Sequence, residues 1–144
     1  MSTKYEALKL ENQLCFPLYA ASREIVKAYY PYLSEIGLTY TQYVTMMVLW
    51  EEGSASVKSL GERLHLDSGT LTPLLKQLEK KGLIRRHRWE EDERVLIASL
   101  TDKGRELEEK ASEVPSKVAG CFSLEPDEAA ELYRLLYKLL DSQQ

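Results

Sequence analysis

The sequence is short of cysteine, histidine and glycine, and each shortage excludes a class of protein. Its two cysteines stand 106 positions apart, and neither of its two histidines lies at metal-ligand spacing from them, so a disulfide scaffold and a zinc site are excluded. Seven glycines and five prolines among 144 residues are too few for a fibrous or low-complexity chain. These counts predict a globular protein that holds no metal ion or other cofactor.

Long apolar runs are also missing. No run approaches the roughly 18 residues that a membrane-spanning helix requires, and the N-terminal stretch MSTKYEALKLENQ has no apolar core of a signal peptide. We therefore expect a cytoplasmic protein that does not enter a membrane. In that reducing compartment, a conspicuous cysteine is either packed in a core or redox-active.

The charge that is present is unevenly distributed. The net charge is −4, yet residues 58–88 carry eight positive and three negative side chains, which gives this segment +5 and leaves −9 for the rest. A basic segment on an acidic scaffold is typical of a nucleic-acid-binding face. Hydrophobic residues make up 44% of the chain, enough for the core of one domain over residues 1–144.

Helical spacing of apolar residues predicts the elements before and after this basic segment. The first helix runs to about Tyr32, with Pro17 either in its first turn or at a kink. Thr39 begins a capping box ahead of a second helix. Thr101 is a cap for a later helix that meets Pro115 as a stop or a kink, and a last helix with a leucine stripe covers 126–140.

The middle of the chain has the pattern of a winged helix-turn-helix. A short helix over 57–64 and a longer one over 69–81 are joined by a turn. Strand-like residues 83–88 and 94–100 then flank a charged tip, which predicts a β-hairpin wing. The fold class is therefore mainly α with one hairpin. Plain packing of two helices in a helical protein is the alternative.

The second helix of this motif begins with short polar side chains. Ser68, Thr70 and Thr72 would let the backbone approach base edges and phosphates, and Lys76 lies one turn further on. In the wing, Arg94 stands beside Asp92 at the tip, where an arginine can enter a narrow minor groove. Further phosphate contacts, or else a solvated strand face, are expected at Arg85, Arg86 and Arg88.

Cys15 lies in the apolar stretch LCFPLY and is either core packing or a reactive thiol. A reactive cysteine must ionise near neutral pH, which requires hydrogen-bond donors or the N-terminus of a helix beside the sulfur. Tyr19 follows at i+4 on the same helix face and could donate its hydroxyl. The other tyrosines of the N-terminal third fit core or interface positions equally well.

Two long segments resemble a known family. VKSLGERLHLDSGTLTPLLKQLEKKGLIRRHR, followed by EEDERVLIASLTDKG, resembles the MarR family of winged-helix repressors, and DSGTLTPLLKQLE with LENQLCFPLY resembles its OhrR branch of organic hydroperoxide sensors. The resemblance runs from about Leu8 to about Leu140. It implies a homodimer on a pseudopalindromic double-stranded DNA operator, with dimerisation helices in about 1–38 and 102–144 and the DNA-binding part in about 39–101.

The same resemblance implies how the protein would respond to a hydroperoxide. Cys15 corresponds to the reactive cysteine of OhrR-type repressors, with tyrosines at Tyr29 and Tyr40 of the partner subunit beside it. Cys121 then either resolves the oxidised Cys15 of the other subunit as a disulfide or is structural, with an external thiol in its place. Other possibilities are release by a noncovalent aromatic ligand, a winged helix that does not bind DNA and, from the class of enzymes, a thiol peroxidase. We expect a regulator and not an enzyme.

Overall fold

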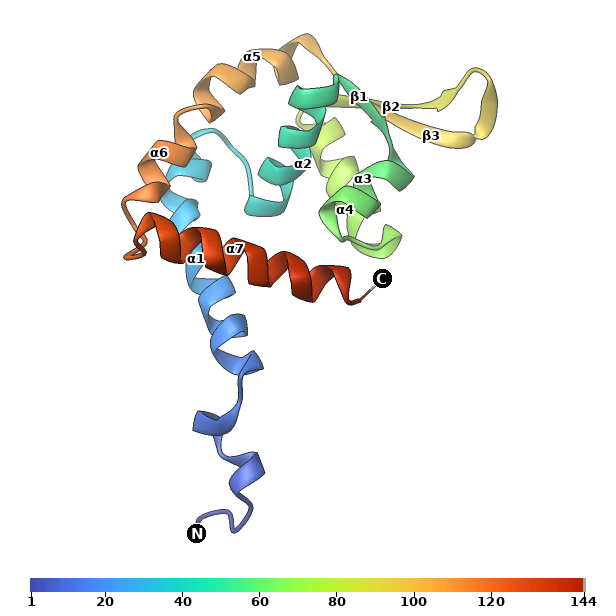
Figure 1. Cartoon of the computed structure of the whole chain (residues 1–144). Coiled ribbons are helices and arrows are strands. Elements are labelled where there is room, and N and C mark those ends of the chain that lie inside the picture. The colour runs from blue at the N-terminus through green and yellow to red at the C-terminus, as the bar shows by residue number, and fades with distance from the viewer. Residues whose placement is uncertain (144) are drawn as a thin grey trace. The chain divides into compact units, whose positions relative to one another are not determined.

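The computed structural model describes residues 1–143 (Figure 1). These residues form two compact units that divide between Val114 and Pro115. Two 3-10 turns, η1 (Glu6–Leu8) and η2 (Leu10–Asn12), precede the long helix α1 (Cys15–Glu35). The remaining elements are α2 (Tyr40–Glu52), β1 (Ser54–Ser56), α3 (Val57–Leu64), α4 (Ser68–Lys80), β2 (Ile84–Trp89), β3 (Asp92–Leu100), α5 (Asp102–Ala111), α6 (Val114–Ala119) and α7 (Pro126–Asp141).

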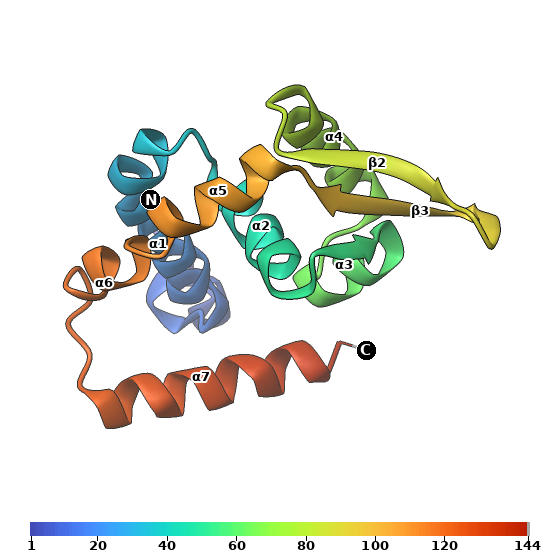
Figure 2. The same ribbon diagram turned by 90° about the horizontal axis from the view of Figure 1, so that it is seen from above.

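The winged helix-turn-helix is present as the sequence predicts. Helices α3 and α4 form the two-helix motif, and β2 and β3 form an antiparallel hairpin that extends away from helices α2 to α4 (Figure 2). The pairing Ile84 with Leu100 sets the register, which shifts between Arg88 and Trp89 at the tip. The sheet has the order β1-β3-β2, and the three-residue strand β1 was not predicted.

The core of the first unit lies among α2, α3, α4 and the base of the wing. The inward side chains are almost fully buried because they recur every three or four residues along each helix, which places them on one face. They include Met46, Leu49, Leu60, Leu71, Leu75, Leu78, Ile84 and Ala98. This packing fixes α4 from its inner side and leaves its outer side uncovered.

Local signals in the sequence placed several element ends correctly. The capping box of Thr39 and Gln42 is formed, with the Gln42 amide donating to Thr39 Oγ1 at 3.3 Å. Gly53 ends α2 with a φ of 80°, and the Thr101 hydroxyl accepts from the Gly104 amide at 3.1 Å to begin α5. Pro115 lies near the start of the separate short helix α6, so the helix before it stops.

Helix α1 begins at Cys15, so Pro17 lies in its first turn. Of the two predicted positions of Pro17, the first turn is therefore confirmed and the kink is not. The helix then continues to Glu35, three residues beyond the expected end. The 3-10 turns that precede it were not predicted. In Figure 1 these turns and the first part of α1 extend away from the winged-helix body.

Gly104 is required where α5 packs against the end of the wing. A Cβ at this buried position would collide with the backbone oxygen of Leu83 and meet Leu100 Cδ2 at 3.1 Å. The Gly104 carbonyl also accepts from Trp50 Nε1 at 2.8 Å. We expect Gly104→Ala to lower the free energy of unfolding by about 1–3 kcal/mol, since the backbone must move.

Chemical denaturation of the two variants Gly104→Ala and Gly120→Ala would measure this effect. A Cβ at Gly120 has nothing within 4 Å, so this control should change stability by no more than about 0.5 kcal/mol. If both substitutions lowered the free energy of unfolding equally, the close contact between Gly104 and Leu83 would not be the cause of the effect.

Candidate functional site

The exposed face of α4 starts at a tightly capped turn. His65 adopts a left-handed φ of 54°, and the Asp67 carboxylate accepts from the Thr70 amide at 2.8 Å. This hydrogen bond from the Thr70 backbone, together with one to its side chain, holds the pKa of Asp67 below its usual range. The cap therefore stays ionised at neutral pH and fixes the first turn of the helix.

The polar residues that the sequence singled out on α4 are placed opposite its buried leucines. Ser68, Thr70 and Lys76 are exposed, and Thr72 is half-buried. Leu71, Leu74, Leu75 and Leu78 hold the inner face. Helix α4 thus presents one polar, basic surface to solvent from a rigid support, as a helix that enters a major groove must.

The wing tip holds one arginine in a fixed geometry. Arg94 Nε lies 3.0 Å from Asp92 Oδ1 and its Nη2 lies 3.0 Å from Oδ2, and the Arg94 amide also donates to Oδ1. These bonds lower the pKa of Asp92 and raise that of Arg94. The Arg94 side chain nevertheless stays 90% exposed, so the carboxylate orients the guanidinium without covering it.

Arg86 differs from its neighbours on the first wing strand. Its guanidinium lies 3.1 Å from the Glu79 carboxylate of α4, its amide donates to the same carboxylate at 2.9 Å, and its side chain is only 19% exposed. Arg85 and Arg88 are exposed. Arg86 therefore joins the wing to α4, and a phosphate contact by this residue stays a prediction.

Cys15 is an exposed, free thiol at the first position of α1. Tyr19 is 58% exposed, and its ring lies 5.6 Å from the Arg23 guanidinium carbon. Within residues 1–143, no hydrogen bond joins Cys15 to Tyr19, so that partnership stays a prediction.

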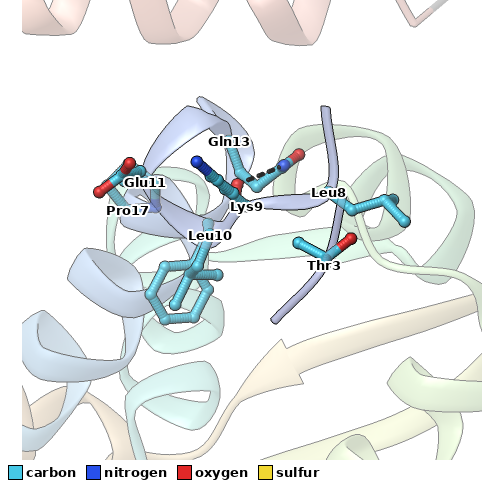
Figure 3. A pocket seen from close by; sticks show the side chains of 8 residues that line it. Thr3, Leu8, Lys9, Leu10, Glu11, Gln13 and Pro17 are labelled. Atoms are coloured by element: carbon cyan, nitrogen blue, oxygen red, sulfur yellow. Dashed lines mark hydrogen bonds between the residues drawn. The ribbon is translucent and has the colours of Figure 1, made fainter. Parts of the chain in front are cut away.

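An open cavity of about 810 Å³ lies between the N-terminal segment and the first turn of α1 (Figure 3). Phe16 and Pro17 of that turn contribute to its wall, as do Leu8 and Leu10 of the N-terminal segment. The Gln13 side chain donates to the Lys9 carbonyl at 2.8 Å and ties this segment together. The wall combines these apolar side chains with the polar side chains of Thr3, Lys9 and Glu11.

Tyr29 and Tyr40 lie together, although they come from different helices. Their ring centroids are 4.9 Å apart in an edge-on arrangement, and Tyr43, which the sequence did not single out for function, completes the cluster at 5.9 Å from Tyr29. Burial raises the pKa of all three phenols, and the neighbouring tyrosines raise those of Tyr40 and Tyr43 further. Their hydroxyls therefore stay protonated and available as hydrogen-bond donors.

This tyrosine cluster cannot serve Cys15 of its own chain. Cys15 and Tyr29 are 14 residues apart on the same helix, which corresponds to about 21 Å at 1.5 Å per residue. Only a second copy of the chain can bring these tyrosines to the sulfur. The geometry therefore agrees with the partner-subunit arrangement that the resemblance implies.

Cys121 is also free and exposed, in the break between α6 and α7. Its thiol lies 4.0 Å from the Lys117 carbonyl. It belongs to the second compact unit, so its pairing with Cys15 stays a prediction. Among the residues that the structure describes, there is no group of histidine, cysteine and carboxylate side chains that could hold a metal ion, and no helix is long and apolar enough to cross a membrane.

Comparison with known proteins identifies the family. A family model described as transcriptional regulator SarA/Rot matches residues 27–111. The organic hydroperoxide resistance transcriptional regulator of Bacillus subtilis is 48% identical over 142 residues, which are 99% of this chain and 97% of that protein. The chain belongs to the OhrR branch of the MarR family. It is thus a member of a family of transcriptional regulators.

Solved structures of a relative named AbfR add two chemical states. One is the structure of reduced AbfR bound to DNA, which has 38% sequence identity to this chain and a TM-score of 0.80. The match covers 98% of this chain and 96% of the AbfR chain. The other is the structure of disulfide-formed AbfR, with 39% sequence identity and a TM-score of 0.67. This match covers 94% of this chain and 95% of the AbfR chain. AbfR is a protein of Staphylococcus epidermidis. The winged helix predicted for this MarR-family member is confirmed by these likenesses.

Proposed function

We propose that this regulator is a homodimeric repressor that leaves its DNA operator when an organic hydroperoxide oxidises Cys15. The observation that carries the proposal is the exposed Cys15 thiol at the start of α1, out of reach of its own chain's tyrosine cluster. Two relatives support the proposal: the Bacillus subtilis protein is an organic hydroperoxide resistance regulator, and AbfR has a disulfide form.

In the reduced state, two copies would read the two halves of a pseudopalindrome. Helix α4 of each copy would enter a major groove with Ser68, Thr70 and Thr72 near the bases, and Lys76 would contact a phosphate. Arg94 would enter the adjacent minor groove, already oriented by Asp92. Neutralisation of phosphates by these cations would make binding fall steeply with salt.

The first and last helices would form the dimer interface. Helix α1 exposes Leu18, Ile25 and Val26, and α7 has no buried residue although leucines recur along it. Apolar side chains spaced in this way on a helix are stable in water only when a partner covers them. A second copy of the chain would cover them and would also bring its Tyr29 and Tyr40 to Cys15.

The sensing reaction would consume one hydroperoxide for each Cys15. The thiolate attacks the terminal peroxide oxygen, the O–O bond breaks, and the alkoxide takes a proton from solvent and leaves as an alcohol. The sulfur, oxidised by two electrons, becomes a sulfenic acid. The protonated hydroxyls of Tyr29 and Tyr40 of the partner subunit would donate hydrogen bonds to the thiolate and to the departing oxygen. The reaction is stoichiometric in Cys15, so we infer a regulator and not an enzyme. A regulator that binds an operator would act in the cytoplasm.

Cys121 of the other subunit would complete the switch. Its thiol condenses with the sulfenic acid to form a disulfide, and one water molecule is released. An exposed thiol in a break between helices has room for this reaction. The new bond would pull on the helices that set the spacing of the two wings, and the fit to the two half-sites would be lost.

Intact mass after oxidation tests the proposal without knowledge of the operator. The reduced protein is treated with one equivalent of cumene hydroperoxide and measured under denaturing, non-reducing conditions. We expect a covalent dimer whose peptide map joins Cys15 to Cys121, and we expect Cys121→Ser to give a monomer that carries one added oxygen. If the wild-type protein gives an oxygenated monomer, Cys121 is structural; an unchanged monomer would contradict thiol sensing altogether.

A further inference from the structure

Lys81 makes two hydrogen bonds that join the end of α4 to the corner between α1 and α2. Its ammonium donates to the Gly37 carbonyl at 2.6 Å and to Gln42 Oε1 at 2.7 Å. Gln42 is only 4% exposed, so its carbonyl oxygen has little access to water as an alternative donor. The bond to Gln42 joins a charged donor to a buried side chain, and such bonds are among the stronger ones in proteins.

Gln42, which accepts the second of these hydrogen bonds, is part of the cap that begins α2. Gln42 Oε1 also accepts from the Thr39 amide at 3.1 Å, while Thr39 Oγ1 accepts from the Gln42 amide. Tyr40 is the first residue of α2 and lies between these two capping residues. The ring that packs on Tyr29 and the oxygen that binds Lys81 are therefore carried by the same turn of backbone.

At the other end, Lys81 is firmly attached to α4. Its amide donates to the Gln77 carbonyl at 3.0 Å, and its carbonyl accepts from Lys103 Nζ of α5 at 2.9 Å. Cavities of about 570 Å³ and 350 Å³ are each lined by both Lys81 and Gly37. The lysine side chain thus has room to move if its acceptors shift, whereas the packed leucines of α4 do not.

We propose that Lys81 is the positioning residue that transmits the state of the tyrosine cluster to α4. This rests on the proposed function, in which Tyr29 and Tyr40 contact the partner's Cys15. Movement of Tyr40 on oxidation would displace the capping turn, the bonds to Gln42 and Gly37 would break, and the last turn of α4, which lies beyond its last buried leucine Leu78, would lose this anchor. A packed element with two discrete arrangements can carry coupling in this way.

The ratio of DNA affinities before and after oxidation measures this coupling. The probe is a duplex selected from a random pool by the reduced wild-type protein. For the wild-type protein we expect oxidation by cumene hydroperoxide to weaken binding by roughly 5- to 150-fold. In Lys81→Met the same oxidation should have an effect that is smaller by roughly 2- to 30-fold. The mass of each sample shows whether Cys15 was oxidised to the same extent.

Lys80→Met is the matched control, because it removes a neighbouring exposed charge that ends the same helix. Its affinity ratio should equal that of the wild-type protein. If Lys81→Met does not fold, Lys81→Gln replaces it, since the shorter amide cannot span both acceptors.

Two results would overturn the role of Lys81. One is an unchanged ratio in a folded Lys81 variant with fully oxidised Cys15, and the other is an equal loss of coupling in Lys80→Met. A wild-type protein that binds DNA equally well before and after oxidation would instead contradict the proposed function. The two failures are therefore distinguishable.

Discussion

Cys15→Ser should bind DNA as tightly as the reduced wild-type protein and should no longer be released by an organic hydroperoxide. Serine has nearly the same size as cysteine, and the site is exposed at the start of α1, so the fold and the reading surface are unaffected. A hydroxyl does not become the thiolate that attacks a peroxide. Titration of a fluorescent duplex with each protein, with and without cumene hydroperoxide, measures the difference.

Cys121→Ser is the matched control for this experiment, since it also replaces one exposed thiol by a hydroxyl. It should still form the sulfenic acid at Cys15 but no disulfide. Release of Cys15→Ser by the hydroperoxide would show that the thiol is not the sensor. The noncovalent ligand that the sequence also allows would then be the remaining explanation for regulation.

Local signals in the sequence predicted most of the fold. The helix over 57–64 agrees with α3 at both ends, because its Ser56 cap and its apolar spacing act within a few residues. Strand β1 could not be found in this way. Its three residues become a strand only by pairing with Ser99, Ala98 and Ile97, more than 40 positions away. Short strands are defined by their partners and not by their own composition.

The site was predictable to the extent that it depends on one element. Cys15 at the start of α1 follows from Pro17, which favours a first turn. By contrast, the bond of Arg86 to Glu79 depends on how β2 lies against α4, and sequence alone presents Arg86 as one more exposed cation. The role of Lys81 is hidden for the same reason, since its acceptors are 44 and 39 positions away.

Arg94→Ala should weaken DNA binding by the reduced protein by at least about tenfold near physiological salt, more than Lys76→Ala does. The Arg94 guanidinium is held by Asp92 in two hydrogen bonds while 90% of its side chain is exposed, so little ordering remains to be done when it enters a groove. Within residues 1–143 no hydrogen bond or ion pair holds the Lys76 ammonium, and a flexible lysine contributes mainly a point charge. Fluorescence anisotropy with the selected duplex at several salt concentrations measures both variants.

The salt dependence separates the two contributions. A dimer of Lys76→Ala loses one phosphate contact in each copy, so the slope of log affinity against log salt should become shallower by about 2. Arg105→Ala, which removes an exposed arginine of α5, should change neither affinity nor slope.

Asp92→Asn tests the orientation of Arg94 directly, because it keeps Arg94 and removes the charge that holds it. The DNA affinity of Asp92→Asn should fall between those of Arg94→Ala and the wild-type protein. Unchanged affinity in Arg94→Ala would remove the wing from the DNA interface and leave α4 as its only reading element.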